Sequence, residues 1–227
     1  MSVLAFLESN NGKISKSGFE VVSYAHQLAA KLGKQTIAVT YGNTGDDALA
    51  SLGEYGANKV LVNKSLTSAD TGQIAKLVLK AVEKENADVI VFSHDLTGRA
   101  VAPRVAARLE CGIATSAVAY PNTEGGFTVK VNMFSGKAYG EIELLTPKKV
   151  ITVSPNALAP VKSAQTATVE NFAADTGEQK VKVVSQKKNE GTISLPEADL
   201  VVSAGRGLKG PENWGMVEEL ANALGAA

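Results

Sequence analysis

Short apolar runs alternate with amphipathic segments along the first half of the chain. Four runs have the length and composition of buried strands, at residues 3–7, 36–39, 59–62 and 88–92. The run at 88–92 is continuous instead of alternating, which is typical of a sheet that is covered on both faces. Helical patterns separate the runs, and this order predicts a parallel sheet with right-handed crossover connections.

Two of the intervening helices have clear patterns. In the stronger one, five apolar residues recur at i, i+3, i+4, i+7 and i+8 and form a single buried face: Ile74, Leu77, Val78, Ala81 and Val82. The other helix has an apolar stripe from Val21 to Leu32. We expect Ser17 to cap its start and Gly33 to end it.

Two shorter helices complete this part of the chain. One is predicted near residues 46–55, just before a glycine. The other is predicted at 102–109, directly after the fourth strand. Pro103 would lie in its first turn, a position that suits proline. Either Ser93 or Thr97 could cap it.

The alternation changes after Gly112. Apolar and polar residues alternate at 127–133 and again at 138–144, on either side of a turn at 135–137. This pattern predicts an antiparallel hairpin added to the parallel sheet. Residues 150–153 predict one further core strand.

The remainder of the chain predicts a connector and the start of a second domain. Residues 161–195 are polar, apart from a strand-like stretch at 181–184, and Pro196 marks the boundary. We therefore expect domains at 1–195 and 196–227. The first is predicted to be a Rossmann-like, three-layer α/β domain with the added hairpin. The second begins with a strand from Leu200 and an amphipathic helix whose apolar residues are Trp214, Val217, Leu220, Ala221 and Leu224.

Composition narrows the classes of function. Of 227 residues, 44% are hydrophobic and 20% charged, which fits a globular protein with a core. Basic and acidic residues number 23 each, which argues against nucleic acid as a partner. No apolar run reaches the ~18–20 residues of a membrane span, so we expect no membrane insertion. Because Cys111 is the single cysteine, we expect a reducing compartment, most simply the bacterial cytoplasm or an organelle matrix.

The first candidate site is a glycine turn in the second domain. There Gly205, Arg206 and Gly207 follow the predicted strand, with Ser203 just before them. Backbone N–H groups at a helix start attract phosphate, and an arginine can bind a pyrophosphate through two hydrogen bonds. The alternative is an ordinary turn with a surface arginine, because the spacing is shorter than a full dinucleotide-binding motif.

The second candidate is the stretch 93–104, at the carboxyl end of the strongest strand, where α/β sheets hold ligands. It fits a capped helix start with solvated arginines, an anion site or a partner interface. His94 is expected to be a loop or capping residue, because adjacent Ser, His and Asp residues cannot form a catalytic triad. With His26 as the other histidine, no metal site is expected. Cys111 is expected to be a packing residue.

A third stretch, Ser154-Pro155-Asn156-Ala157-Leu158-Ala159-Pro160, is stiffened by two prolines. It fits either the start of a linker or a surface that docks another domain or subunit.

Several stretches resemble the alpha subunit of electron transfer flavoprotein. LTGRAVAPRVAARL at 96–109 is similar to a loop and helix of that family, and FSGKAYGEIE at 134–143 is similar to its hairpin. VSPNALAP at 153–160 resembles a family segment that usually carries arginine where Ser154 stands. LVVSAGRGLKGPENW at 200–214 is the most specific, with Ala204 in place of a frequent glycine.

The resemblance implies a carrier of electrons that is not itself an enzyme. It implies an N-terminal α/β domain that packs against a homologous beta subunit and a C-terminal domain that carries most of the FAD site. Electrons would come from acyl-CoA or other dehydrogenases and pass toward a quinone oxidoreductase or another acceptor. Arg206 would contact the flavin cofactor, together with Ser203, Gly205 and Gly207. Donor, acceptor and any electron bifurcation stay unassigned.

In the family, the strand and helix at 200–224 are followed by more of the flavin domain. We therefore expect this chain to be a fragment that binds FAD weakly or not at all. Two alternatives stay open. A stand-alone adenine-nucleotide module would require a glycine-rich phosphate loop in the first domain, where the loop at 10–13 is short. A docking scaffold would bind the beta subunit without holding a cofactor.

Overall fold

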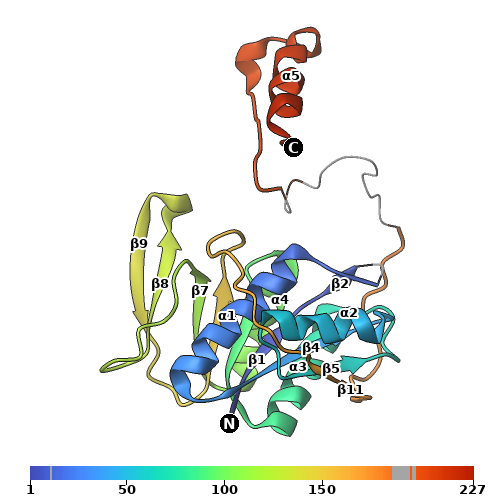
Figure 1. The fold of residues 1–227 in the computed structure, drawn as a ribbon, viewed down its shortest axis with the longest axis vertical. Helices are drawn as coiled ribbons and strands as arrows, with labels where there is room; N and C mark the ends of the chain where they lie inside the picture. Colours follow the sequence, from blue (N-terminus) through green and yellow to red (C-terminus); the bar gives the residue numbers. More distant parts are fainter. Residues whose placement is uncertain (11, 186–194, 196–197) are drawn as a thin grey trace. The chain divides into compact units, whose positions relative to one another are not determined.

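The computed structural model describes residues 1–10, 12–185, 195 and 198–227 (Figure 1). These residues form two compact units, Met1–Lys182 and Val183–Ala227. The boundary expected between 195 and 196 stays a prediction, and residues 196–197 lie outside the described residues.

The first unit is built on one large sheet, in which nine strands are described. In chain order they are β1 (Ser2–Phe6), β4 (Gln35–Tyr41), β5 (Lys59–Asn63), β6 (Ala87–Ser93), β7 (Gly112–Ala117), β8 (Thr128–Met133), β9 (Ala138–Glu143), β10 (Lys149–Val153) and β11 (Thr168–Asn171). Their order in space is β11-β5-β4-β1-β6-β10-β7-β8-β9. Every neighbouring pair from β11 to β7 is parallel, and the last two pairs are antiparallel. The predicted parallel sheet and hairpin are therefore confirmed.

Helices cover both faces of the parallel part (Figure 1). They are α1 (Lys16–Leu32), α2 (Asp46–Ala50) with a 3-10 turn at Ser51–Tyr55, α3 (Thr71–Glu85) and α4 (Leu96–Arg108). One buried cluster joins α1 and the α2 region to the sheet, and a second joins α3 and α4 to the opposite face. The fold is thus the expected three-layer α/β arrangement. A short antiparallel pair, β2 (Ser9–Asn10) with β3 (Lys13–Ile14), precedes α1.

The central strand β1 divides its side chains between the two layers. Val3 and Ala5 belong to the α1 cluster, and Leu4 and Phe6 to the α3–α4 cluster. This alternation is the period-2 geometry of a strand, and it explains why the sequence shows a continuous apolar run. Each fully buried aliphatic side chain contributes about 1.5–3 kcal/mol to folding.

Two helix starts differ from the sequence-based expectation. The side chain of Ser15, not Ser17, caps α1 by accepting the N–H of Gly18 at 3.3 Å, and Gly33 ends the helix in the left-handed region as expected. Helix α4 begins at Leu96, so Pro103 lies inside the helix instead of in its first turn. Pro103 is exposed. The N–H that proline lacks is therefore missing on the solvent side of the helix.

Two strands of the sheet were not expected from the pattern. β7 (Gly112–Ala117) has mostly small residues, and β11 (Thr168–Asn171) is a mostly polar strand at the sheet edge. The strand-like stretch at 181–184 is not a strand in the structure, and its valines are exposed. Hydrophobic alternation therefore did not identify the edge strand β11.

The second unit contains α5 (Gly215–Leu224), which confirms the predicted helix. Two 3-10 turns, Arg206–Leu208 and Pro211–Asn213, precede it. The predicted strand around Leu200 has no assigned ladder, yet its backbone is paired. Val202 donates its N–H to the Ala227 carbonyl at 2.9 Å, and Ala227 donates to the Leu200 carbonyl at 3.0 Å. Ala227 thus donates to one residue and accepts from the residue two positions later, which is the hydrogen-bond pattern of two parallel strands. In the sequence, α5 lies between the two paired segments.

Candidate functional site

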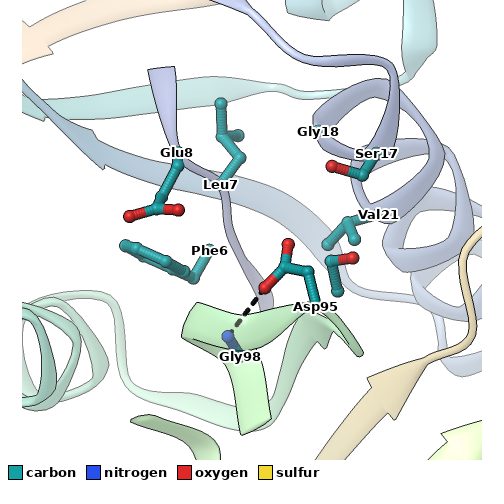
Figure 2. Close-up of a pocket in the computed structure, with 9 residues that line it drawn as sticks. Phe6, Leu7, Glu8, Ser17, Gly18, Val21, Asp95 and Gly98 are labelled. Atoms are coloured by element: carbon teal, nitrogen blue, oxygen red, sulfur yellow. Dashed lines mark hydrogen bonds between the residues drawn. The ribbon is translucent and has the colours of Figure 1, made fainter. Parts of the chain in front are cut away.

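The crevice between the carboxyl ends of β1 and β6 is where this topology would hold a ligand. The chain passes from β1 through β4 to β5 on one side, and then returns to place β6 on the other side of β1. Ligands of open α/β sheets bind at such a switch point. Figure 2 shows the residues that line it, from the ends of both strands and the starts of α1 and α4.

Protein side chains fill this crevice. The remaining cavity has a volume of about 10 Å³, which is room for about one water molecule. The carboxylates of Glu8 and Asp95 are among the side chains that line it (Figure 2). A bound phosphate would therefore meet two acidic groups in a space too small for it.

The helix starts at the crevice already have partners within the chain. Asp95 accepts the N–H of Gly98 at 2.8 Å and so caps α4, in place of the expected Ser93 or Thr97. Ser15 caps α1 in the same way. Free N–H groups at a helix start are the groups that bind phosphate. Because side chains of the chain already accept hydrogen bonds from some of them, fewer N–H groups remain for a ligand.

Glycine at position 98 serves close packing. A Cβ there would overlap the carbonyl oxygen of Ser93, and a Cβ on Gly18 would lie 2.9 Å from the Cγ2 atom of Ile14. These glycines let the first turns of α4 and α1 approach their neighbours. The crevice geometry therefore argues against a stand-alone adenine-nucleotide module in this unit.

His94 belongs to a small polar network at the same sheet edge. Its Nδ1 atom lies 2.8 Å from Oγ1 of Thr152, and the same oxygen accepts the N–H of Ser116 at 3.0 Å. Burial lowers the pKa of His94, the charge of Arg99 lowers it further, and Asp95 opposes both. The histidine is thus a polar residue that ties β6 to β10, as the loop or capping expectation implied.

The surroundings of Cys111 fit a packing residue. Cys111 is half-buried against the α3–α4 cluster, and burial raises the pKa of its thiol. Among the described residues, no group of three or more His, Cys, Asp or Glu side chains could hold a metal ion. None of the described helices is long and apolar enough to cross a membrane.

Helix α1 holds the proline-flanked stretch 154–160 in place. Glu20 accepts the N–H of Asn156 at 3.0 Å, and Lys16 donates to the Asn156 side-chain oxygen at 2.8 Å. Ser23 accepts the N–H of Val161 at 2.8 Å. The stretch is therefore fixed on the first unit, while its use as a docking surface stays a prediction.

The glycine turn lies in the second unit and is open. Arg206 begins a 3-10 turn, and the exposed side chain has no hydrogen bond or ion pair to any described residue. A Cβ on Gly205 or Gly207 would meet nothing within 4 Å. The sequence suggested that the helix starts directly at the turn. Helix α5 instead begins at Gly215, so its N-terminal N–H groups are not at the turn. Ser203 precedes the turn and is exposed.

Known protein families match both parts of the chain. The sequence profile of the electron transfer flavoprotein domain matches residues 3–177, and that of the electron transfer flavoprotein FAD-binding domain matches 194–227. The electron transfer flavoprotein subunit alpha of Syntrophomonas wolfei is 33% identical over 234 residues, which cover 98% of this chain and 70% of that protein. The chain belongs to the electron transfer flavoprotein alpha-subunit family.

Other relatives agree. The electron transfer flavoprotein subunit alpha of Bacillus subtilis is 26% identical over 230 residues, or 99% of this chain and 70% of that protein. A lactate dehydrogenase (NAD(+),ferredoxin) subunit, LctC, of Acetobacterium woodii is 26% identical over 99% of this chain and 56% of that protein. The family resemblance drawn from short motifs is thus confirmed over nearly the whole chain.

For this alpha-subunit chain, the sequence pointed to the carboxyl edge of the sheet but not to the residues that close it. Asp95 belongs to the candidate stretch 93–104 but was not predicted as the helix cap, although aspartate is a preferred cap, and Glu8 was not considered. Glu8 carries no comparable signal in the sequence.

Replacing Gly98 with alanine should destabilise the first unit by about 1–3 kcal/mol, since the new Cβ would force α4 away from β6. Urea unfolding measures the change. Gly45→Ala is the matched control, because nothing lies within 4 Å of a Cβ there, and it should cost less. Equal losses for the two variants would contradict this packing role.

His94 should make stability depend on pH. Because its pKa is lowered in the folded state, the unfolded chain binds more protons, and stability falls as pH drops from about 7 through the ordinary histidine value. His94→Gln should flatten this dependence between about pH 7 and about pH 5.5. Unfolding midpoints for both proteins test it, and identical slopes would exclude the histidine as the cause.

Proposed function

We propose that this chain acts in an electron transfer flavoprotein that binds FAD together with a beta subunit. It would accept electrons from dehydrogenases, acyl-CoA dehydrogenases among them, and pass them toward a quinone oxidoreductase or another acceptor. The supporting observation is that the FAD-binding domain profile matches the segment with the open arginine turn, residues 194–227. The chain would be an electron carrier, so it requires a cofactor site and no catalytic side chains.

The residues of the turn suit the phosphates of FAD. Arg206 is exposed and has no partner among the described residues, so its guanidinium is available for two parallel hydrogen bonds to phosphate oxygens. Gly205 and Gly207 leave space for close approach of a ligand to the backbone. The Ser203 hydroxyl could add a hydrogen bond. When bound, FAD would supply the redox chemistry, and these residues would hold it.

The same openness implies weak binding by the chain alone. Met216, Leu220 and Leu224 of α5 are more than half exposed, and Val217 is the buried apolar residue of this helix. One arginine in an open turn cannot enclose a ligand, since small-molecule sites bury most of the ligand surface. We therefore infer that this 227-residue chain by itself retains little FAD.

The hairpin of the first unit supports a role in docking the beta subunit. β9 is the edge strand of the sheet, and the aromatic side chains of Phe134 and Tyr139 are 74% and 66% exposed. An unpaired edge strand with exposed aromatic residues favours association with another chain. A scaffold without cofactor is the alternative, and FAD binding by the complex separates the two.

The setting of this function follows from the relatives. Several are bacterial electron transfer flavoprotein subunits, which supports the bacterial cytoplasm as the compartment. The family also includes a lactate dehydrogenase subunit, so the electron donor stays open.

Replacing Arg206 with glutamine should weaken FAD binding by the complex with the beta subunit. Loss of one charge-assisted contact to phosphate corresponds to about tenfold or more in Kd. Titration of apo complex with FAD, followed by flavin fluorescence, measures it. Lys209→Gln removes a cation from the same segment and should bind nearly as wild type. Equal affinity of both variants would contradict the role of Arg206, and a wild-type complex without FAD would contradict the function itself.

Replacing Phe134 and Tyr139 together with serine should weaken association with the beta subunit by about tenfold or more, as expected when buried aromatic anchors are lost. Analytical ultracentrifugation of the mixed subunits gives the affinity, and unfolding of the isolated chain should be unchanged. As the control, Leu96→Ser removes an apolar residue of α4 that is even more exposed, at 85%. If the double variant binds the beta subunit as tightly as this control does, the hairpin is not the docking surface.

A further inference from the structure

A second hollow of the first unit lies between α3 and α4, on the helical layer away from the hairpin. Its volume is about 390 Å³, within the range of small-molecule sites. Ala75, Leu79 and Ala107 form apolar parts of its lining, and the segment that carries Glu178 and Lys180 forms one wall. We call this hollow the α3–α4 groove.

The wall is fixed to the start of α3 by hydrogen bonds. Asp70 caps α3 with one carboxylate oxygen, which accepts the N–H of Gln73 at 2.9 Å. The other oxygen accepts the N–H groups of Lys180 at 2.6 Å and Val181 at 3.2 Å. Gln73 in turn donates to the Gly177 carbonyl at 2.8 Å. The capping box of α3 therefore also builds the groove.

Hydrogen bonds from backbone N–H groups, that of Gln73 first, hold the pKa of Asp70 below its usual range. The carboxylate is thus charged at neutral pH, and the wall should stay attached. The Asp70 carboxylate oxygens accept hydrogen bonds from backbone N–H groups. The carboxylate therefore neutralises the positive charge of the nearby lysine and arginine side chains only in part.

The groove has an excess of positive charge at its rim. Lys76, Arg104, Arg108 and Lys180 line it, against the acidic residues Asp70 and Glu178. Arg104 and Arg108 are exposed one turn apart on α4, and neither has a hydrogen bond or ion pair to any described residue. The whole chain has no net charge, so this excess is local and not a general property of the protein surface.

Small side chains create the space, and cations surround it. Alanines at 75 and 107 leave room where larger residues would fill the gap between the helices. An apolar floor with guanidinium groups at the rim matches a ligand with an apolar body and an anionic group. The volume suits a small molecule better than a folded partner.

We propose that the α3–α4 groove binds a small organic anion, with its phosphate or carboxylate on Arg104 and Arg108 and its apolar body over Ala107. This site shares no lining residue with the switch-point crevice. It would serve as a ligand site on the first unit that does not depend on FAD.

Calorimetric titration of the full 227-residue chain at low ionic strength tests the site. Phenyl phosphate and octanoate are the two probes, and they distinguish a phosphate source from a carboxylate source. Phenol and octanamide are their uncharged counterparts, and inorganic phosphate is the anion without an apolar body. We expect saturable binding of at least one organic anion, and binding at least about tenfold weaker for its uncharged counterpart and for inorganic phosphate.

Two variants separate the groove from general attraction to a basic surface. Arg104→Gln with Arg108→Gln should weaken binding about tenfold or more, because the paired guanidinium groups are lost. Ala107→Phe should abolish binding by filling the groove while all four cations remain. Arg99→Gln removes an exposed arginine of the same helix that does not line the groove, and should change affinity less than about twofold.

Lack of saturable binding by both organic anions would overturn the proposal. So would equal weakening by Arg99→Gln and the double variant, or unchanged binding in Ala107→Phe. The unfolding of each variant is measured beside the titration and shows whether a loss of binding is due to misfolding. If Ala107→Phe misfolds, Ala107→Leu, which fills less of the groove, takes its place and must weaken binding. None of these results depends on FAD or the beta subunit.

Discussion

The burial of β1 on both faces is the constraint on which the rest of this structure depends. Val3, Leu4 and Ala5 have no exposed surface, because helices cover the sheet from both sides. A sheet enclosed in this way offers a ligand only its edges and the outer surfaces of its helices. The carboxyl edge is the usual choice, and here Asp95 and Glu8 occupy it. Little room therefore remains for a ligand at this edge of the first unit.

Two aspartates at helix starts have opposite consequences for binding. Asp95 caps α4 at the switch point, and its carboxylate stands where the phosphate of a nucleotide would otherwise be held. Asp70 caps α3 and binds two further backbone N–H groups of the departing chain, which builds the wall of the α3–α4 groove. The same local interaction, a carboxylate on free N–H groups, thus closes one hollow and forms another. The difference lies in what the second carboxylate oxygen contacts.

The sequence predicted the interior of this fold well and its margins poorly. Periodicity found α3 and the strands on either side of β1, because burial on two faces leaves a continuous apolar run. It missed β7, where the parallel part of the sheet meets the hairpin, and the edge strand β11, because neither has a continuous apolar run. It placed the α1 cap at Ser17 instead of Ser15, since two serines in one turn give the same signal. The arginine turn could be located from its motif, but its lack of partners could only come from the structure.

The two units differ in how completely their polar and apolar groups are covered. In the first unit, the switch-point crevice has room for about one water molecule, and Asp95 and Ser15 cap the helix starts beside it. In the second, Arg206 has no described partner and most of the apolar face of α5 is exposed. An exposed apolar face is unfavourable in isolation, whereas an exposed arginine is hydrated and available to a ligand. Covering the apolar face with a further protein surface would be favourable. The second unit is therefore suited, as we propose, to a ligand site that a partner protein helps to enclose.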